Sequence, residues 1–570
     1  MAFDLVIRNG TVVDGSGADR YRADVGIVGD RIARVGRIRE RGIAEVDAEG
    51  HVVTPGFVDG HTHMDAQVFW DRQGVNSCWH GVTTVVMGNC GFTLAPARAS
   101  ERALVVRNLE RAEDIDPAAL ELGIDWRWET FAQYLDAVDA LPKGIHYAAN
   151  VGHSALRTFV MGERAFTEEA TDDDLAAMEQ ELADGLRAGA VGFTTSRSEH
   201  HETSDDRPVA SRLAAWDEVV RLVGVMADLG VGMLEGGAEG VLDPDPDVRA
   251  RAAGRIHDLA VTTGVPVTSG IIATDPGGRQ MLALIDRINA AGGRMIGQSH
   301  CRGINVLLSF RTRLPFDLLP EWQTVRALPL AEQRAHLADP TTKARLAQAA
   351  MHGDYPRWRG IGAMPRRPDF DGIRVYERGL PPNPTVSEVA AVRGVDPATA
   401  MIDLALESDF EVLFIQPSLY PQSEEVLLEV LRHPSTVMTF SDSGAHLGQI
   451  CDASIHTHLL GYWVRERQAF TLEEGVRMLT RDPAAAWGFA DRGLVREGMV
   501  ADCNVFDPDT IAPGVPRVVT DLPGGGNRLA QRATGFRATV VAGVPTIVDG
   551  EATGATPGRL VRNRPARTRG

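Results

Sequence analysis

The chain has 570 residues, of which 44% are hydrophobic and 24% charged, so its composition is globular and its length allows one large core plus a smaller one. The formal net charge of −19 argues against a nucleic-acid partner, because neutralising phosphates requires clustered Lys and Arg. No uninterrupted apolar run approaches the roughly 18 residues that span a bilayer, so we expect no membrane role.

The first residues of the chain and its cysteines indicate the cellular compartment. The opening "MAFDLVIRNG" alternates like a strand, which argues against a secretory signal. The five cysteines are scattered and form no CxxC pair. We therefore expect a reduced, cytoplasmic setting.

Both ends of the chain have the pattern of β-structure. Residues 3–53 and 494–549 consist of short alternating runs that are broken by turns such as Asn9-Gly10. Neither piece is long enough to bury a core alone. We predict that residues 1–54 and 490–552 form one small β-sandwich, and that the Gly-, Pro- and Arg-rich tail 553–570 is loose.

Between the two ends, strands and helices alternate. An opening strand within 52–58 is followed by apolar strands at 83–88, 146–153, 190–196, 231–236, 265–272, 294–300 and 436–446. Helices are expected near 100–112, 171–187, 216–230 and 281–293, the second of them with Thr171 as its cap. This α/β order predicts a TIM-type (β/α)8 barrel over residues 55–489, with its site at the carboxyl ends of the strands.

The regular spacing breaks after the seventh strand. Residues 303–410 contain several helical patterns, which we interpret as an insertion over the mouth of the barrel. The insertion would serve as a lid or as a contact in a homo-oligomer, and the sequence leaves both open.

Four side chains that can act as metal ligands or proton acceptors lie at predicted strand ends. "PGFVDGHTHMD" places His61 and His63 two residues apart in an extended segment, so both imidazoles point the same way. Cys90 lies in "MGNCG" and Asp442 in "TFSDSGAH". An isolated HxH is more often two ordinary polar residues, and a buried Cys is usually inert. Their shared location at one end of one barrel favours a metal site with Asp442 beside it.

These motifs carry a resemblance. "VTPGFVDGHTHMD", "GVTTVVMGNCGFTLAP", "NVGHSALR", "TFSDSGAH" and "LTRDPAAAWGFADRGLVREGMVADCNVFDP" resemble the amidohydrolase superfamily, in its D-aminoacylase (N-acyl-D-amino-acid deacylase) branch. The resemblance covers nearly the whole chain. It implies a metal-bearing TIM barrel with a two-ended β-sandwich, and hydrolysis of C–N bonds in acylated amino compounds. It implies metal ligands at His61, His63, Cys90 and Asp442, with Asp442 also the general base, and places His153 near the site.

The chain departs from this pattern at its metal ligands. Many relatives bridge two metals with a lysine on strand four, but the only lysines here, Lys143 and Lys343, lie elsewhere. Relatives also carry histidines on strands five and six that hold tightly bound zinc, and here "MLEGGAEG" and "VTSGII" have none. We favour one Zn²⁺ per chain over two. Substitutes for the second site would be Glu235 first, then His300, His200 or His201.

The residues expected to recognise the substrate also differ from the pattern of the D-aminoacylase branch. The loop after Asp442 lacks the basic stretch that suits a carboxylate in relatives. Arg197 and Arg302 are the nearest candidates for a carboxylate clamp, and a structural ion pair is an equal interpretation of each. An N-acyl-D-amino acid is therefore the leading small-molecule substrate, with a cyclic amide or a carbamate as alternatives.

The expected reaction is hydrolysis by metal-activated water, with Asp442 moving the proton and His153 or His300 stabilising the oxyanion. Two competing hypotheses are a lyase or isomerase on the same metal, and a non-catalytic binding protein on a decayed barrel. Water uptake would distinguish the first from a hydrolase, and absence of a transition metal would favour the second.

Overall fold

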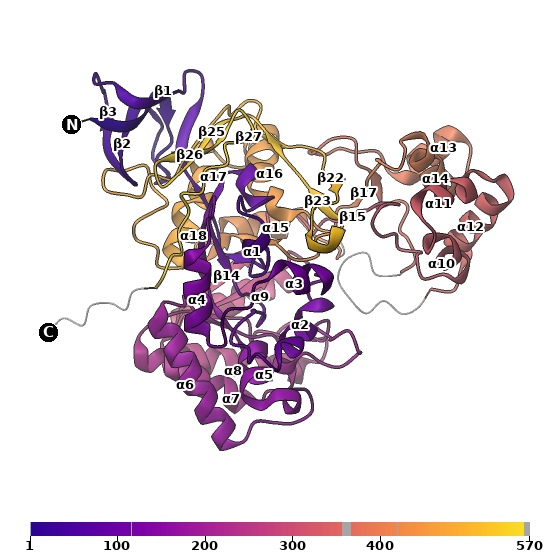
Figure 1. The fold of residues 1–570 in the computed structure, drawn as a ribbon, viewed down its shortest axis with the longest axis horizontal. Coiled ribbons are helices and arrows are strands. Elements are labelled where there is room, and N and C mark those ends of the chain that lie inside the picture. The colour runs from indigo at the N-terminus through magenta and orange to yellow at the C-terminus, as the bar shows by residue number, and fades with distance from the viewer. Residues whose placement is uncertain (1, 116, 356–365, 419, 564–570) are drawn as a thin grey trace.

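The computed structural model describes residues 2–115, 117–355, 366–418 and 420–563 (Figure 1). Strands from both ends of the chain share one nine-stranded sheet, because β20 pairs antiparallel with β5, Cys503 opposite Pro55. Its strands are β1 (Phe3–Val12), β2 (Tyr21–Val28), β3 (Arg31–Gly36), β4 (Gly42–Asp47), β5 (Val52–Pro55), β20 (Cys503–Phe506), β25 (Phe536–Val541), β26 (Val544–Val548) and β27 (Glu551–Ala552). The expected union of the two ends in one sheet is thus observed, whereas the sandwich itself stays a prediction.

The middle of the chain contributes parallel strands in three groups. The pairings run β6–β8–β9, then β10–β11–β12–β13–β14–β18, and finally β19–β7. The strands are β6 (Phe57–Asp59), β7 (His61–Thr62), β8 (Val82–Met87), β9 (His146–Ala149), β10 (Val151–Gly152), β11 (Phe193–Thr194), β12 (Leu234–Glu235), β13 (Val267–Ile271), β14 (Met295–Ser299), β18 (Thr436–Met438) and β19 (Phe440–Ser443). Every residue of β8 is buried, as expected for a parallel strand covered on both faces.

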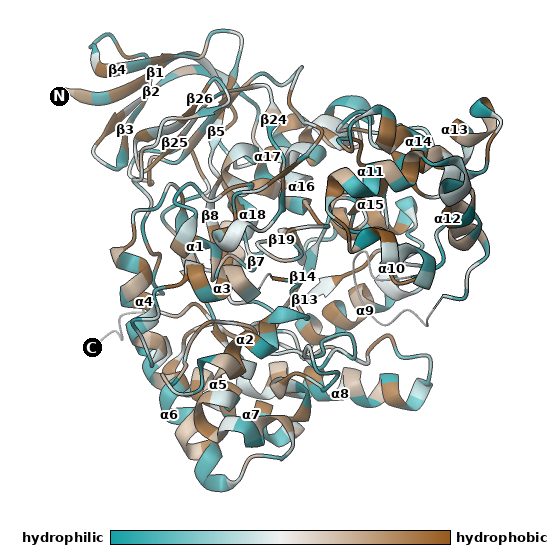
Figure 2. Cartoon of the chain, turned by 45° about the vertical axis from the view of Figure 1, so that its right-hand side comes forward, coloured by the Kyte–Doolittle hydropathy of each residue, from teal (hydrophilic) through white to brown (hydrophobic). Residues whose placement is uncertain are grey.

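Helices follow these strands on the outside. They are α2 (Arg102–Glu110), α4 (Phe131–Ala140), α5 (His153–Met161), α6 (Asp172–Ala188), α7 (Trp216–Leu229), α8 (Pro246–Thr263), α9 (Gly277–Ala290), α15 (Glu424–Arg432), α17 (Leu472–Leu479) and α18 (Arg481–Ala486). Thr171 caps α6 in a reciprocal box with Asp174, which confirms the predicted cap. Met178 and Leu182 are its buried stripe, and Figure 2 shows hydrophilic stretches on the outer helices α6 and α8.

The insertion forms a helical lobe beside the strands (Figure 1). Its helices are α10 (Pro320–Arg326), α11 (Leu330–Ala338), α12 (Pro340–His352), α13 (Val386–Arg393) and α14 (Pro397–Glu407). A small sheet joins its two ends, with β15 (Val306–Leu308) and β16 (Arg374–Val375) on either side of β17 (Phe414–Gln416). The lobe has a core of its own, in which Trp322 packs on Phe316 with ring centroids 4.3 Å apart.

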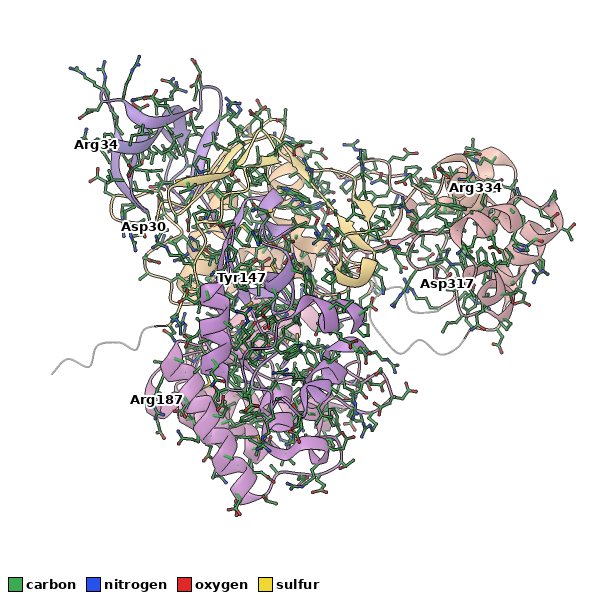
Figure 3. The ribbon with its side chains drawn as sticks, in the orientation of Figure 1. Asp30, Arg34, Tyr147, Arg187, Asp317 and Arg334 are labelled. Atoms are coloured by element: carbon green, nitrogen blue, oxygen red, sulfur yellow. The ribbon has the colours of Figure 1, made fainter. Side chains whose placement is uncertain are left out.

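The end of the chain differs from the expected loose tail. Leu560 bridges to Tyr147 of β9, and the backbone N–H of Val561 donates to Tyr147 at 2.6 Å. Arg562 donates to the carbonyl of Ala188 at 2.8 Å. Figure 3 shows Tyr147 in the interior, whereas Arg34, Arg187 and Arg334 lie at the periphery. Residues 557–563 are therefore held by backbone and arginine contacts that composition does not reveal, and 564–570 lie outside the described residues.

Across the described ranges, no helix combines the length and the apolar character needed to cross a membrane.

Candidate metal centre

Two imidazoles stand side by side where the first barrel strand ends. His61 begins β7 and His63 follows it directly, so alternation along the extended chain sends both rings to one side. The ring centroids are 5.4 Å apart, and the residues are 1% and 3% exposed. The pair is thus buried and close enough to share a cation.

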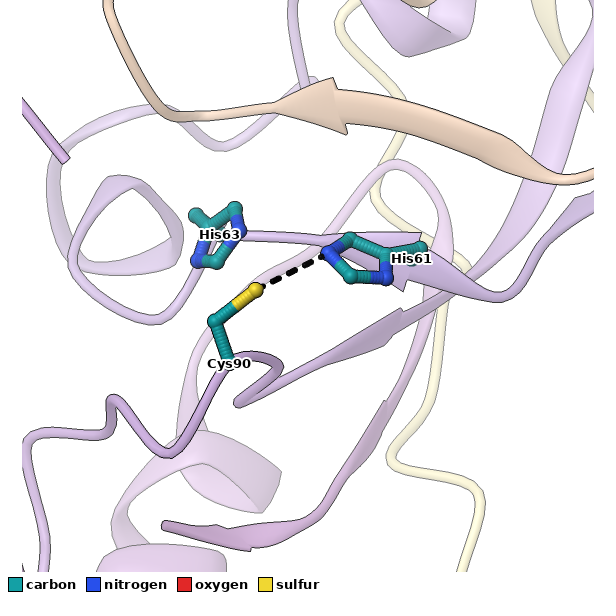
Figure 4. Close-up of side chains that lie close together, drawn as sticks. All are labelled: His61, His63 and Cys90. Atoms are coloured by element: carbon teal, nitrogen blue, oxygen red, sulfur yellow. Dashed lines mark hydrogen bonds between the residues drawn. The ribbon is translucent and has the colours of Figure 1, made fainter. Parts of the chain in front are cut away.

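Cys90 approaches the pair from the turn after β8. Its backbone is left-handed, with φ of 56°, and it turns the thiol into the space between the two rings (Figure 4). The following Gly91 permits this approach, because a Cβ there would lie 3.2 Å from the Cα of Thr195. The Cys90 Sγ is 3.5 Å from His61 Nε2. One donor atom from each of His61, His63 and Cys90 lies within 4.8 Å of the others.

Asp442 closes the group from the last strand. β19 pairs parallel with β7, and Asp442 itself has a left-handed backbone with φ of 51°. Its Oδ1 is 3.3 Å from His61 Nε2 and 3.4 Å from His63 Nε2. Metal–ligand bonds of about 2.0–2.3 Å at tetrahedral angles separate neighbouring ligand atoms by about 3.3–3.8 Å. These donors therefore have the chemistry and the spacing that zinc requires.

Gln298 orients the first imidazole. This side chain on β14 accepts a hydrogen bond of 2.7 Å from His61 Nδ1. With the proton on Nδ1, Nε2 keeps its lone pair toward Cys90 and Asp442. Sequence reasoning missed Gln298, although its place near the end of the seventh strand was a signal that could have found it.

The electrostatics of the group are dominated by buried acids. Burial raises the pKa of Glu235 to about 7 and that of the Cys90 thiol well above its usual range. Burial also raises the pKa of Asp442, but the adjacent imidazoles of His61 and His63 outweigh it and hold that pKa well below its usual range. A divalent cation would favour the charged form of all three acids.

Two further predicted residues border the centre. Glu235 accepts a hydrogen bond of 2.8 Å from the Cys90 backbone N–H, and its other oxygen lies 4.0 Å from His61 Nδ1. The ring of His300 stacks on Phe440 at 4.4 Å, and neither of its buried nitrogens has a partner in the described part of the chain. Glu235 thus holds the Cys90 backbone by a hydrogen bond, while the two ring nitrogens of His300 are available to a ligand.

His153 is occupied elsewhere. Its Nε2 donates to Glu218 at 2.7 Å, and its Nδ1 meets the Thr195 hydroxyl at 2.8 Å. Arg157 binds the same Glu218 carboxylate. Both ring nitrogens of His153 thus have protein partners in a buried network with Glu218, and the expected oxyanion role stays a prediction that these contacts do not support.

The two arginines expected to clamp a substrate carboxylate are tied to protein groups. Arg302 pairs with Asp452 at 2.6 Å, and Arg197 donates to the carbonyl of Ala214 at 2.6 Å. Arg302 thus makes the ion pair that its structural interpretation expects, and the clamp role of either arginine stays a prediction. His201 bonds Ser196 through Nδ1 at 2.7 Å, and His200 is half-buried in the same loop.

Sequence reasoning also missed Glu113. This residue follows α2, is 3% exposed, and brings Oε2 to 3.5 Å from His63 Nε2. It lies far from any strand end, so neither its position nor its neighbours in the sequence signalled it. The adjacent Asp114, together with His446, lines a cavity of about 860 Å³.

The amidohydrolase family matches residues 44–265 and 335–547. The chain belongs to this family. The D-aminoacylase of Alcaligenes xylosoxydans xylosoxydans is 28% identical over 571 residues, covering 98% of this chain and 97% of the relative. The N-acyl-D-glutamate deacylase of the same organism is 30% identical over 540 residues, covering 91% and 90%.

Solved structures agree with these relatives. The N-acyl-D-glutamate deacylase of Bordetella bronchiseptica, complexed with zinc and a phosphonate inhibitor, superposes with a TM-score of 0.64 at 25% identity, covering 99% of this chain and 100% of the other. A D-aminoacylase studied for its binuclear metal center gives 0.65 at 25% identity, covering 98% and 100%. The resemblance to the D-aminoacylase branch is confirmed, and the chain is a hydrolase of C–N bonds other than peptide bonds.

Proposed function

We propose that this amidohydrolase is metal-dependent and cleaves the amide bond of a small N-acylated compound, with an N-acyl-D-amino acid as the leading substrate. The observation that carries the proposal is the placement of Asp442 Oδ1 at 3.3 and 3.4 Å from the Nε2 atoms of His61 and His63. The full-length similarity to D-aminoacylase and N-acyl-D-glutamate deacylase supports the substrate class.

One Zn²⁺ per chain is the favoured cofactor. His61, His63 and Asp442 would hold it, with Cys90 on the flank of His61. Within the described residues, His61, His63 and Cys90 are the one group of three His, Cys, Asp or Glu side chains whose ligand atoms lie close enough together to hold a cation, which supports one site over two. When bound, the cation would polarise the substrate carbonyl and lower the pKa of water toward about 7.

The protein groups would handle the proton and the developing charge. Asp442 would accept the proton of the attacking water and return it to the leaving nitrogen. A protonated ring nitrogen of His300, free of protein partners in the described residues, would donate to the carbonyl oxygen as it becomes negative. The substrate would enter through the cavity bordered by His446 and Asp114.

Two structural expectations belong to the same proposal. The pairing of β19 with β7, together with the run of β6 into β7, β9 into β10 and β18 into β19, supports one closed eight-stranded barrel. All five cysteines are free thiols, which supports a reducing, cytoplasmic environment.

A substrate panel tests the proposal. Purified enzyme with added Zn²⁺ is assayed on N-acyl-D-amino acids, their L-enantiomers and cyclic amides, with ¹⁸O-labelled water to detect hydrolysis. We expect ¹⁸O in the carboxylate released from an N-acyl-D-amino acid. Turnover of these substrates without ¹⁸O uptake would indicate a lyase or isomerase and overturn the hydrolase proposal.

The Asp442→Asn variant tests the role of the carboxylate. We expect kcat to fall by about 10²–10⁴-fold, because the amide cannot accept the proton. Metal content is measured on the same sample, so that loss of the cation is separated from loss of the base. Unchanged kcat with full metal occupancy would contradict the assignment of Asp442.

A further inference from the structure

Glu113 has a buried carboxyl group, although nothing in the surrounding sequence predicts that this side chain is buried. It lies in the turn after α2, and one oxygen, Oε2, is 3.5 Å from His63 Nε2. The other oxygen, Oε1, is buried without a hydrogen-bond partner in the described part of the chain. A buried carboxylate oxygen without a partner is costly, so the site calls for a group that this oxygen can bind.

The backbone fixes Glu113 to the loop that carries Asp442. The Glu113 N–H donates to Leu109 at 3.0 Å, and its carbonyl accepts from the His446 N–H at 2.6 Å. His446 and Asp114 both have left-handed backbones, with φ of 46° and 49°. Strained backbone of this kind persists only where surrounding contacts hold it. The carboxylates of Glu113 and Asp442 thus reach His63 from segments that are bonded to each other.

The charges around Glu113 leave it uncompensated. The charged groups that act on it most are themselves acids, Asp442, Asp65 and Glu235. Among the described residues its ion-pair partner is His63, and no Arg or Lys lies within ion-pair distance. A cation at His63 would neutralise this cluster, which a neutral imidazole cannot do.

We propose that Glu113 is a further ligand of the cation held by His61, His63 and Asp442. The inference rests on the proposed function, because it concerns the same cation. The Glu113–His63 separation of 3.5 Å is close to the Asp442–His63 separation of 3.4 Å, and both match neighbouring ligand atoms on one tetrahedral ion. Glu113 flanks His63 as Cys90 flanks His61. Two carboxylates and two imidazoles then hold the ion, with the carboxylates balancing its charge.

Metal binding to a matched set of variants tests the ligand role. Wild type, Glu113→Gln and the control Glu121→Gln, an exposed acid on α3 (Pro117–Gly123), are stripped of metal with a chelator. Each is titrated with Co²⁺, followed by its visible d–d absorption, and with Zn²⁺ against a chelating indicator. Thermal unfolding is recorded with and without Zn²⁺.

We expect Glu113→Gln to weaken Zn²⁺ binding by roughly 10- to 100-fold and to change the Co²⁺ absorption, while Glu121→Gln matches wild type. The Zn²⁺-induced rise in Tm should shrink, and the metal-free variant should be no less stable than wild type, because the buried Glu113 carboxyl has an oxygen without a hydrogen-bond partner and acids as its charged neighbours. Glu113→Asp, which keeps the charge but shortens the side chain, should give intermediate affinity.

The outcomes separate the two proposals. If Glu113→Gln binds Zn²⁺ as tightly as wild type with the same Co²⁺ absorption, the ligand role of Glu113 is overturned while the metal-dependent function stands. If Glu113→Gln does not fold, the same comparison is made with Glu113→Asp, and affinity and spectrum equal to wild type again overturn the ligand role. If wild type itself binds neither ion, the proposed function fails first.

Discussion

At the scale of single residues, the centre depends on unusual backbone at two of its donors. Cys90 and Asp442 both have positive φ, a conformation that costs a non-glycine residue about 1–2 kcal/mol. The strained conformation persists because surrounding contacts hold it. At Cys90, for example, the backbone N–H donates a hydrogen bond to Glu235. The strain aims a thiol and a carboxylate at His61 and His63, which their own strand already orients.

The first prediction concerns Gln298, which positions a ligand without binding the cation itself. Gln298→Leu removes the acceptor for His61 Nδ1–H, so we expect zinc affinity to fall about 10–100-fold. Competition with a chelating indicator measures it. Gln298→Glu, which keeps an acceptor, should restore affinity, and Gln180→Ala on the surface of α6 is the control. Equal affinity of the Leu variant and wild type would refute the positioning role.

The candidate donors could be named from the sequence, whereas among their supporting partners only Glu235 and Gln298 had a signal there. His61, His63, Cys90 and Asp442 stand at strand ends, and barrel geometry brings strand ends together. His153 contacts Glu218, 65 residues further along the chain, and nothing local predicts that contact.

At the scale of elements, the periodic patterns located the helices and strands well. The expected strand at 83–88 corresponds to Val82–Met87, and the expected helix at 171–187 to Asp172–Ala188. The expected strands at 190–196 and 231–236 shrink to Phe193–Thr194 and Leu234–Glu235. Hydropathy predicts that a strand exists, but its length depends on pairing with neighbours.

The second prediction tests the cap of α6. Thr171→Ala removes the side-chain oxygen that accepts from the Asp174 N–H, so the free energy of unfolding should fall by about 1 kcal/mol. Urea unfolding followed by circular dichroism measures the change. Thr171→Ser keeps the hydroxyl and should stay close to wild type. A variant with alanine as stable as wild type would show that the cap contributes nothing.

At the scale of the whole molecule, a buried ion pair ties the last part of the chain to the barrel. Asp502 binds His146 of β9 at 3.1 Å and accepts from the Ala542 N–H at 2.8 Å. Arg492 lies 3.6 Å from its other oxygen. The pair joins segments more than 350 residues apart in the chain, which local sequence patterns cannot predict.

The third prediction tests this pair. Asp502→Asn removes the charged partner of the buried His146 and leaves Arg492 with Asp491 alone, so the free energy of unfolding at pH 7 should fall by about 3–5 kcal/mol. Urea unfolding compares it with wild type and with the exposed control Asp509→Asn. A loss no larger than that of the control would mean that the pair is not stabilising.

The same variant should show a defined dependence on pH. Burial raises the pKa of Asp502, but His146 and Arg492 outweigh it and hold that pKa below its ordinary value of 3.8. Because the folded pKa is the lower one, this stabilisation is present above pH 3.8 and is lost as pH falls through the folded pKa. The gap between wild type and Asp502→Asn should therefore narrow only below that pH. A gap that closed at higher pH would contradict this assignment.

The most direct test of the whole account is anomalous diffraction at the zinc edge, from crystals of the protein grown with Zn²⁺. We expect one strong peak about 2.0–2.2 Å from Nε2 of both His61 and His63 and from a carboxylate oxygen of Asp442. A peak elsewhere, or none at full zinc supply, would contradict the claim that these three residues share a cation.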